Sequence, residues 1–510
     1  MGNCKISRSK KQPNKNNQSS MRLIAERRRI SKTTGASYTE VTSSYKKLKS
    51  LIDTSAVDVR EVYDFEHKPI GTGHFGSVVV ARLKKWPYTS FAAKILKKDE
   101  LKEDVNFVIN EINIMRDTDH PHIVKFCETY SAKDRLYIIM EHLSGDTLKH
   151  YLKTRLVVPE VEAKKIVFQM CLAINHLHEK SVAHRDIKLE NFLFKDPQGF
   201  DIKLIDFGLA KSHKGVLMNS HIGTPYYAPP EILKNQSYGE KCDEWSLGVC
   251  VYKMLTGHYP FTGKDANGLF NQIAYQKLND KPMARLSAKA KDFVKALLVK
   301  NPAKRKRVSE LLHHPWLVDY HINFCELTST SINAHIFDHI LAVREINTFG
   351  VQLLKILITF FPPPNDYNYA VCAFFGADYS LTGLITPKGL VRFFADHGRH
   401  LYIEDADCII KSLALYEEGF MTYTEFLIAA IDRQEWIMRQ KLVPQIFSFL
   451  DVDNSLIVTV DNLIELFKRF GYQTEREYIK SLIKFMGDDV LDRGFNLQTF
   501  QAFVHGNFFS

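Results

Sequence analysis

The chain has 510 residues, of which 45% are hydrophobic and 25% are charged; this length allows roughly three domains, and this composition permits a large buried core. No run approaches the ~20 consecutive apolar residues that a membrane-spanning helix needs. The eight cysteines form no C-x-x-C pair and no metal-ligand spacing, which favours a cytoplasmic, reducing compartment over a disulfide framework or a zinc site.

Almost all of the net charge lies in the first 32 residues. They hold ten Lys or Arg and one acidic residue, Glu26, and so contribute +9 of the +10 carried by the whole chain. The remainder is close to neutral, which argues against a general nucleic-acid-binding surface. Residues 1–62 are also rich in Asn and Ser, and we expect them to form a basic, disordered tail.

The tail begins with Met1-Gly2-Asn3-Cys4. Removal of Met1 would expose Gly2 to myristoylation, and Cys4 could carry a palmitoyl chain. The usual pattern has Ser or Thr at position 6, where this chain has Ile6. Two acyl chains, or one with a polybasic patch, give stable attachment, so we expect the protein on the cytoplasmic face of a membrane. The alternative is a solvated tail, because many proteins begin Met-Gly by chance.

A glycine-rich motif follows at residues 70–78, which read as strand, turn and strand. Its glycines, Gly71, Gly73 and Gly76, would let backbone amides approach phosphate groups without a clash from a Cβ atom. The same pattern can mark a dinucleotide site. Here no nearby helix or acidic ribose ligand supports that alternative.

Lys94 ends a β-like apolar run at residues 91–94. A lysine beside a core strand is costly without a partner, so a phosphate group is the better explanation. We expect its counter-ion to be Glu111, which lies in a helix-patterned stretch at residues 110–115. Taken alone, a glutamate in such a stretch would more often be a surface residue. The order of Lys94, Glu111, Asp186 and Asp206 along the chain favours the ion pair over that alternative.

The most informative stretch is residues 184–191, with the sequence HRDIKLEN, followed by DFG at residues 206–208. It supplies a carboxylate for an incoming hydroxyl at Asp186 and a lysine for a phosphoryl group at Lys188. Asn191 and Asp206 add oxygen ligands that suit magnesium. Phosphoryl transfer needs this equipment, because its catalysis is mostly positioning and charge neutralisation. The length, order and spacing of the two motifs make chance agreement improbable.

These motifs resemble those of the eukaryotic protein kinases, and the resemblance covers residues 63–317. It implies that Asp186 orients the substrate hydroxyl and accepts its proton, and that Lys188 contacts the γ-phosphate. Asn191 and Asp206 would hold magnesium. The ATP site implied by the resemblance consists of Gly71, Gly73, Gly76, Val78, Lys94, Glu111, the gatekeeper Met140 and the hinge residue Glu141.

Further positions agree with that resemblance. Lys188, two residues after the catalytic aspartate, is similar to the serine/threonine class of kinases. Asp243 matches a helix aspartate that braces the catalytic loop. Glu231 and Arg305 match a buried ion pair of the large lobe. Glu231 is the last residue of a motif that is usually A-P-E and is here Pro229-Pro230-Glu231.

Residues 318–361 carry apolar side chains at helical spacings. The pattern predicts two amphipathic helices broken near residues 347–350. Their apolar faces need a partner, which is either the substrate cleft or the units that follow. Three prolines at 362–364 end the segment.

The rest of the chain, residues 362–510, repeats itself with a fixed period. Four helix–loop–helix units can be placed with loops starting at Asp378, Ala414, Asp451 and Asp488. Such a period signals stacked units of one type. The repeat resembles four EF-hands arranged as two paired lobes.

None of the four loops has a complete set of calcium ligands. A calcium loop needs oxygens at positions 1, 3 and 5, glycine at 6 and a bidentate glutamate at 12. Position 12 holds Gly389 in the first loop and Asn462 in the third, and the second loop begins with Ala414. We therefore expect helix pairs that pack but no tight calcium site. The weak candidates are Asp451, Asp453 and Ser455 in the third loop, then Asp378, Ser380 and Thr382 in the first.

Kinase, junction helices and four EF-hand units in this order resemble the calcium-dependent protein kinases of plants and protists. The resemblance implies an α+β chain, in which a bilobal kinase fold precedes an all-α EF-hand-like domain of two paired lobes. It also implies an ATP- and magnesium-dependent serine/threonine kinase that acts on protein substrates. The expected partners are ATP, a protein substrate, a membrane surface and an intramolecular junction–EF-hand contact, without nucleic acid.

Two alternatives stay open at this point. One is a catalytically silent scaffold that uses the kinase and EF-hand frames for binding. The other is a true calcium-sensor kinase with one or two weak sites.

Overall fold

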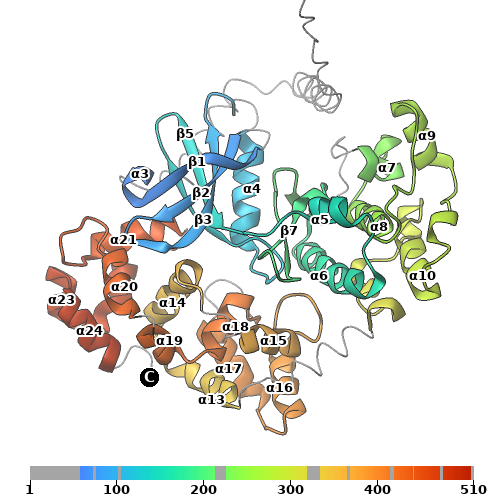
Figure 1. The fold of residues 1–510 in the computed structure, drawn as a ribbon. Helices are drawn as coiled ribbons and strands as arrows, with labels where there is room; N and C mark the ends of the chain where they lie inside the picture. Colours follow the sequence, from blue (N-terminus) through green and yellow to red (C-terminus); the bar gives the residue numbers. More distant parts are fainter. Residues whose placement is uncertain are drawn as a thin grey trace, which may run out of the picture.

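The computed structural model describes residues 58–72, 76–101, 105–212, 225–318, 334–363, 368–413, 419–439, 441–470, 472 and 475–506. Gly2 and Cys4, with the rest of the tail up to residue 57, lie outside the described residues, as do Gly73 and the start of the second loop at Ala414. The described chain forms a sheet-rich lobe, a helical lobe and a helical C-terminal region (Figure 1). The predicted α+β class is confirmed.

The N-terminal lobe is a five-stranded antiparallel sheet in the order β1-β2-β3-β5-β4. The central and inner strands are rich in hydrophobic and β-branched residues and are buried in continuous runs, whereas the edge strand β1 is largely exposed. In this register Val78 lies opposite Lys94, and Ala92 opposite Met140. The elements are α3 (Val59–Val62), β1 (Tyr63–Thr72), β2 (Gly76–Leu83), β3 (Trp86–Lys97), α4 (Val105–Asp117), β4 (Phe126–Ser131) and β5 (Arg135–Glu141).

The C-terminal lobe of the kinase fold is built around α6 and α8, which are buried along most of their length. The chain between α6 and α8 contains two small antiparallel sheets, in which β7 pairs with β8 and β6 pairs with β9. The elements are α5 (Leu148–Arg155), α6 (Glu160–Glu179), β6 (Val182–Ala183), η1 (Leu189–Asn191), β7 (Phe192–Phe194), β8 (Ile202–Leu204), β9 (Lys211–Ser212), η2 (Pro225–Tyr227), α7 (Pro230–Leu233), α8 (Lys241–Thr256), α9 (Ala266–Tyr275), η3 (Lys281–Met283), α10 (Ala288–Leu297), η4 (Pro302–Lys304) and α11 (Val308–Leu311).

The junction contains the two helices that the sequence predicts. The break between them is stabilised by Asn347, whose side chain accepts a hydrogen bond of 2.8 Å from the Gly350 amide and so caps the second helix. The elements are α13 (His335–Ala342), η5 (Val343–Glu345) and α14 (Thr348–Phe360).

The four repeated units follow the junction. The elements are α15 (Asn368–Ala377), α16 (Pro387–Asp396), α17 (Ile403–Leu413), α18 (Tyr423–Ala430), α19 (Arg433–Arg439), α20 (Leu442–Leu450), α21 (Val460–Arg469), α22 (Arg476–Ile483), η7 (Lys484–Met486), α23 (Asp488–Arg493) and α24 (Leu497–Gly506). The loops pair two by two through isolated antiparallel bridges, Ile385 with Met421 and Val458 with Phe495. Each bridge joins the eighth positions of two loops, so the units form two pairs.

The fourth unit differs from the prediction. A loop was expected from Asp488, but Asp488–Arg493 forms the helix α23. Its first turn carries Asp488 and Asp489, which a helix N-terminus stabilises through its dipole, and Val490 is buried. The acidic residues that resemble calcium ligands here are therefore residues of a helix.

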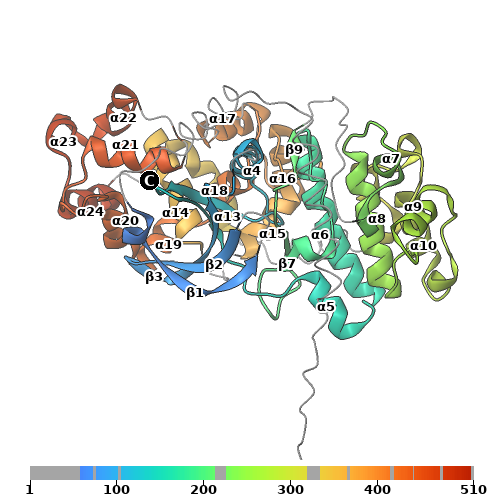
Figure 2. The same ribbon diagram turned by 90° about the horizontal axis from the view of Figure 1, so that it is seen from above.

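The C-terminal region runs along the kinase fold beside both lobes, as the two ribbon views show (Figures 1 and 2). The junction helix α14 packs on α17, α18 and α22. At its end, Phe360 and Phe361 contact Phe91 and Trp86 of β3. Of the two partners considered for the junction, the repeated units are the ones that α14 contacts, together with the N-terminal lobe.

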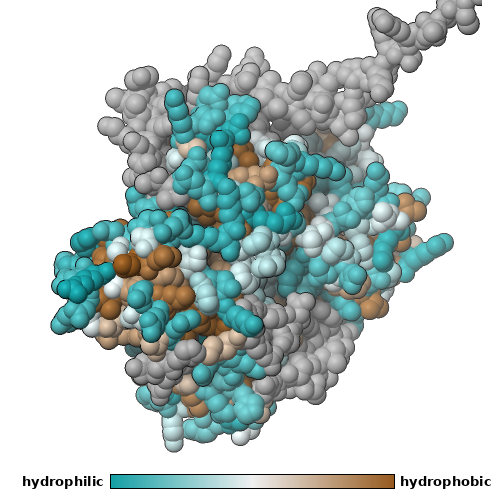
Figure 3. All heavy atoms as spheres, turned by 60° about the vertical axis from the view of Figure 1, so that its left-hand side comes forward, coloured by the Kyte–Doolittle hydropathy of each residue, from teal (hydrophilic) through white to brown (hydrophobic). Residues whose placement is uncertain are grey.

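Figure 3 turns the C-terminal units toward the reader and shows hydrophobic side chains clustered among hydrophilic ones. Among the described residues of the last two units, the exposed large apolar side chains are Leu456, Ile457 and Phe485.

Candidate active site

Lys94 and Glu111 form a buried ion pair between β3 and α4. The Lys94 ammonium donates a hydrogen bond to Glu111 Oε1, and the Glu111 side chain is 3% exposed. Lys94 Nζ also lies 3.7 Å from Asp206 Oδ1. Burial alone would lower the pKa of Lys94, but the carboxylates of Glu111 and Asp206 outweigh it and raise this pKa. Lys94 is therefore charged and placed beside Asp206, as expected of a phosphate-binding lysine.

The loop that carries Asp186 is braced by Asp243 of α8. The fully buried carboxylate of Asp243 accepts hydrogen bonds of 2.8 Å from the backbone amides of His184 and Arg185. Burial would raise the pKa of Asp243, but His178 and these amides hold it below its usual value. Arg185 has φ +66°, a strained conformation that such surroundings must impose. The loop is thus preorganised.

Asp186 gathers two of the predicted partners. Its Oδ2 accepts a bond of 2.6 Å from Lys188 Nζ, and its carbonyl oxygen accepts one of 2.8 Å from Asn191 Nδ2. The latter bond uses the amide nitrogen of Asn191 and leaves Oδ1 as the oxygen of that side chain available for coordination. Together the residues form the catalytic cluster, which we define as Lys94, Glu111, Asp186, Lys188, Asn191 and Asp206.

The two aspartates of the catalytic cluster have pKa values shifted in opposite directions. Burial raises the pKa of Asp186 in spite of Lys188. For Asp206 burial also acts to raise the pKa, but Lys94 and other nearby cations outweigh it and lower this pKa. Such a separation is how paired carboxylates acquire different roles: Asp206 stays ionised and half-exposed, while Asp186 is closer to accepting a proton.

The segment after Asp206 is held by contacts on both sides. Phe207 is fully buried, and its ring lies 5.2 Å from that of His184. Asn110 of α4 donates a bond of 2.7 Å to the Ala210 carbonyl. Because α4 also carries Glu111, this bond ties the position of α4 to that of Asp206.

Gly76 is required for a reason that the sequence did not reveal. A Cβ atom at Gly76 would lie 1.8 Å from the carbonyl oxygen of Ile95 on the neighbouring strand. The backbone approach between β2 and β3 therefore excludes any side chain there. At Gly71 a Cβ would meet only ordinary contact, 3.9 Å from Val78.

Glu141, expected at the hinge after Met140, directs its side chain toward Lys125 and toward Lys203 of β8. Its Oε1 accepts bonds of 2.6 Å from the Lys125 amide and from Lys203 Nζ. The carboxylate thus fixes the end of β5 (Arg135–Glu141) against β8. Lys125 and Lys203 are partners that the sequence analysis missed.

The predicted ion pair of the large lobe is present. Arg305 donates to both oxygens of Glu231, at 2.8 and 3.1 Å, and both side chains are at most 2% exposed. Pro229 precedes α7 as its N-cap and leaves this pair intact.

The carboxylates of the first and third loops are turned into their own backbones. Asp378 accepts bonds from the Gly383 and Thr382 amides at 2.6 and 3.2 Å and from the Ser380 hydroxyl at 3.1 Å. Burial raises the pKa of Asp378 to about 6.

In the third loop the equivalent residue is Asp451, which accepts bonds of 3.0 Å from the Ser455 and Leu456 amides. Asp453 is exposed; hydrogen bonds from Ser455 and Asn462 lower its pKa to about 2. Among the described residues, no group of three or more His, Cys, Asp or Glu side chains is arranged to hold a metal ion.

The sequence analysis missed the residues that join the repeated units to the kinase fold. Asn175 and His176 of α6 contact the carbonyls of Leu381 and Thr382 at 2.8 Å. Lys85 Nζ donates to the Ser448 and Asp451 carbonyls at 2.7 and 3.0 Å, at the end of α20. The partners are more than 200 residues apart, so no local pattern could have identified them.

The protein kinase domain family matches residues 65–317 of this chain. Calcium-dependent protein kinase 3 of Plasmodium berghei is 31% identical over 417 residues, which cover 80% of this chain and 73% of that protein. Calcium-dependent protein kinase 5 of Plasmodium falciparum is 29% identical, with coverage of 84% and 75%. Calcium-dependent protein kinase 17 of Arabidopsis thaliana is 28% identical, with coverage of 88% and 84%.

The chain belongs to the calcium-dependent protein kinase family. As a member of this family it is an ATP-dependent serine/threonine protein kinase that acts on protein substrates and uses magnesium. The silent scaffold considered above is not favoured. Within the described residues, no helix combines the length and the apolar character that crossing a membrane requires.

Proposed function

We propose that the catalytic cluster transfers the γ-phosphate of ATP to a serine or threonine hydroxyl. In this proposal Asp186 orients the hydroxyl and accepts its proton, and Lys188 contacts the γ-phosphate. The raised pKa of Asp186 supports this role, because a base with a pKa nearer to the working pH accepts a proton more effectively. The observation that carries the proposal is the 3.7 Å approach of Lys94 to Asp206, which joins the two halves of the cluster.

The cluster also fits magnesium and ATP. Asp206 and Asn191 offer the oxygen ligands that Mg²⁺ prefers, and the half-exposed carboxylate of Asp206 is accessible. Bound magnesium would bridge phosphate oxygens and neutralise charge during transfer. Lys94 would hold the α- and β-phosphates, and Glu111 would orient Lys94.

The remaining ATP contacts that we propose come from the glycine-rich strands and the hinge. They are Gly71, Gly73, Gly76, Val78, Met140 and Glu141.

Phosphorylation of a protein substrate tests these roles. We expect Asp186→Asn to lose activity while it still binds ATP, because Asp186 acts on the hydroxyl. Lys94→Met should weaken ATP binding itself, which calorimetry measures. If Asp186→Asn transfers phosphate as fast as the unmodified chain, the assignment is wrong.

We further propose that the C-terminal units regulate the kinase from their docked position and hold calcium weakly at best. Asp451, Asp453 and Ser455 of the third loop would bind it first. Asp378, Ser380 and Thr382 of the first loop would bind it next. Support comes from position 12 of both loops, where neither Asn462 nor Gly389 can chelate. Calorimetry of the full chain with calcium tests this proposal. Heat from tight, stoichiometric calcium binding would contradict it.

We also propose that acyl chains on Gly2 and Cys4 attach the basic tail to a cytoplasmic membrane surface. The support is the motif together with the positive charge of residues 1–32. Mass spectrometry of the protein expressed in a eukaryotic cell tests the modification, with Gly2→Ala as control. An unmodified Gly2 would overturn it.

We propose that the chain is organised into four consecutive parts. They are the tail at 1–62, the kinase domain at 63–317, the junction at 318–361 and the repeated units at 362–510.

A further inference from the structure

Glu425, in the second repeated unit, is paired with a lysine of the junction. It occupies position 12 counted from Ala414, where a calcium loop has its bidentate glutamate. One of its oxygens, Oε1, accepts a bond of 2.5 Å from Lys355 Nζ. The other, Oε2, accepts one of 2.7 Å from the Thr422 amide. Both oxygens therefore have partners, one of which is a cation.

Lys355 reaches this position from the junction. It is the one charged residue of α14, whose other side chains are mostly apolar and buried. The Lys355 side chain is 13% exposed and that of Glu425 is 5% exposed. An ammonium group in such a helix is costly unless it is paired, so the contact with Glu425 accounts for its presence there.

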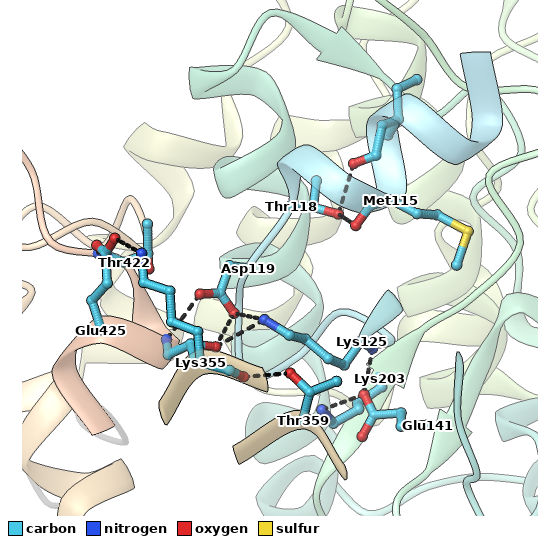
Figure 4. Close-up of polar contacts among 12 residues, drawn as sticks. Met115, Thr118, Asp119, Lys125, Glu141, Lys203, Lys355, Thr359, Thr422 and Glu425 are labelled. Atoms are coloured by element: carbon cyan, nitrogen blue, oxygen red, sulfur yellow. Dashed lines mark hydrogen bonds and ion pairs between the residues drawn. The ribbon is translucent and has the colours of Figure 1, made fainter. Parts of the chain in front are cut away.

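The helix that contains Glu425, α18, is docked on the kinase fold through Thr424. Figure 4 shows Asp119 and Lys125 of the kinase fold beside Lys355, Thr422 and Glu425. Thr424 donates twice to Asp119: its amide to Oδ2 at 2.9 Å and its hydroxyl to Oδ1 at 2.8 Å. Lys125 Nζ joins the same site, 2.7 Å from Asp119 Oδ1 and 2.8 Å from the Thr424 hydroxyl. Burial would raise the pKa of Asp119, but Lys125 and Thr424 outweigh it and lower this pKa well below its usual range.

Asp119 and Lys125 lie on the connection from α4 to β4, next to two parts of the active site. Thr118 bonds the Ile114 carbonyl at 2.9 Å and so closes the end of α4, the helix that carries Glu111. The Lys125 amide bonds Glu141 at the hinge. A displacement of α18 would therefore act on the element that positions Glu111.

We propose that Lys355 is a built-in cation that takes the place of a calcium ion at Glu425, so that α18 stays docked on Asp119 whether or not calcium is present. The proposal deepens the regulatory part of the proposed function and rests on it. A free ion binds and dissociates with its concentration. A lysine of the same chain does not, so the second unit would be held in its ion-bound arrangement permanently.

The test uses the full chain and the variants Lys355→Met, Lys355→Arg and Lys411→Met. Lys411 is an exposed lysine of α17 and serves as the matched surface control. Two readouts are compared in EGTA and in calcium: phosphorylation rate, and amide hydrogen exchange of residues 115–126 and 423–430. Hydrogen exchange reports docking even if the chain proves inactive, so failure of the proposed kinase function and failure of this proposal are distinguishable.

We expect the unmodified chain to give the same exchange at residues 423–430 with and without calcium. Lys355→Met should increase exchange in both segments and lower the rate roughly tenfold, because it leaves Glu425 buried without its cation. Lys355→Arg should retain most of the protection and Lys411→Met all of it.

A second variant covers the case in which Lys355→Met does not fold. In Lys355→Met with Glu425→Met neither charge remains buried, so the protein should fold while α18 still loses its fixed cation. Exchange that equals that of the unmodified chain, in Lys355→Met or in Lys355→Met with Glu425→Met, would overturn the proposal. So would a calcium-dependent rise in protection at residues 423–430 of the unmodified chain.

Discussion

The catalytic cluster and the repeated units both contain carboxylates in sites that could bind a cation, but they hold them differently. In the cluster, the Asp206 side chain is 48% exposed and contacts Lys94 at a distance of 3.7 Å, which leaves its oxygens accessible. In the units, Asp378 and Asp451 are buried and accept bonds from their own loops, and Glu425 is paired with Lys355. An accessible carboxylate suits a ligand, whereas one whose oxygens are all bonded serves the fold.

The largest effect should come from the accessible carboxylate. Asp206→Ala removes the oxygen ligand that we propose for magnesium and one of the two carboxylates beside Lys94. We expect the phosphorylation rate to fall by ~10²–10³-fold, the usual cost of losing one group that stabilises developing charge. Thermal unfolding should change little, because the side chain is half-exposed. A variant that keeps its rate would show that Asp206 is not the ligand we take it to be.

The next effect concerns a carboxylate whose partner is also buried. Glu231→Gln leaves the Arg305 charge uncompensated, and we expect the free energy of unfolding to fall by ~3–5 kcal/mol. Urea denaturation measures it. The matched control is Lys306→Ala, which removes an exposed pair with Glu310 and should cost at most ~1 kcal/mol. Equal effects of the two changes would contradict the distinction between buried and exposed pairs.

Asp378 allows the carboxylates that are bonded within their own loops to be tested through the pH dependence of stability. Its pKa is raised to about 6 in the folded protein, so the folded state binds its proton more tightly than the unfolded state. The contribution to stability is therefore full below the unfolded pKa and falls as the pH rises toward 6. In the unmodified protein this decline should amount to ~1–3 kcal/mol of unfolding free energy. In Asp378→Asn it should be absent, as denaturation at several pH values would measure. Parallel profiles for the two proteins would rule out the shift.

The smallest effect is expected at Asp453. Its carboxylate is exposed and its pKa is lowered to about 2 by hydrogen bonds. A lowered pKa contributes stability above the unfolded value, which is lost as the pH falls toward 2. At neutral pH, Asp453→Asn should change the unfolding free energy by no more than ~0.5 kcal/mol. It should also reduce any heat of calcium binding that calorimetry measures. A large stability loss would mean that the third loop depends on this residue for its fold.

How far the sequence predicts the molecule depends on how local the information is. The catalytic motifs were found because phosphoryl transfer requires particular side chains at short, fixed spacings, as in residues 184–191. The structure brings them together with Lys94 and Glu111. The paired helix–loop–helix units were found from their period, because each unit repeats the same apolar pattern.

The errors and omissions have physical causes. Asp488 was taken for the start of a loop, because an acidic residue that suits a calcium ligand also suits the first turn of a helix. For Gly76 the sequence suggested only phosphate approach, and it missed the close contact with the Ile95 carbonyl on the neighbouring strand. The role of Lys355 was missed, since its partner Glu425 lies 70 residues away and periodicity carries no information about such a pair.

The most direct test of the central claim is transfer of labelled phosphate from ATP to a protein substrate by the full chain, with magnesium and EGTA present. The account predicts transfer by the unmodified chain and none above background by Asp186→Asn. If the two proteins give the same signal, the residues gathered around Asp186 and Asp206 do not form the site of phosphoryl transfer.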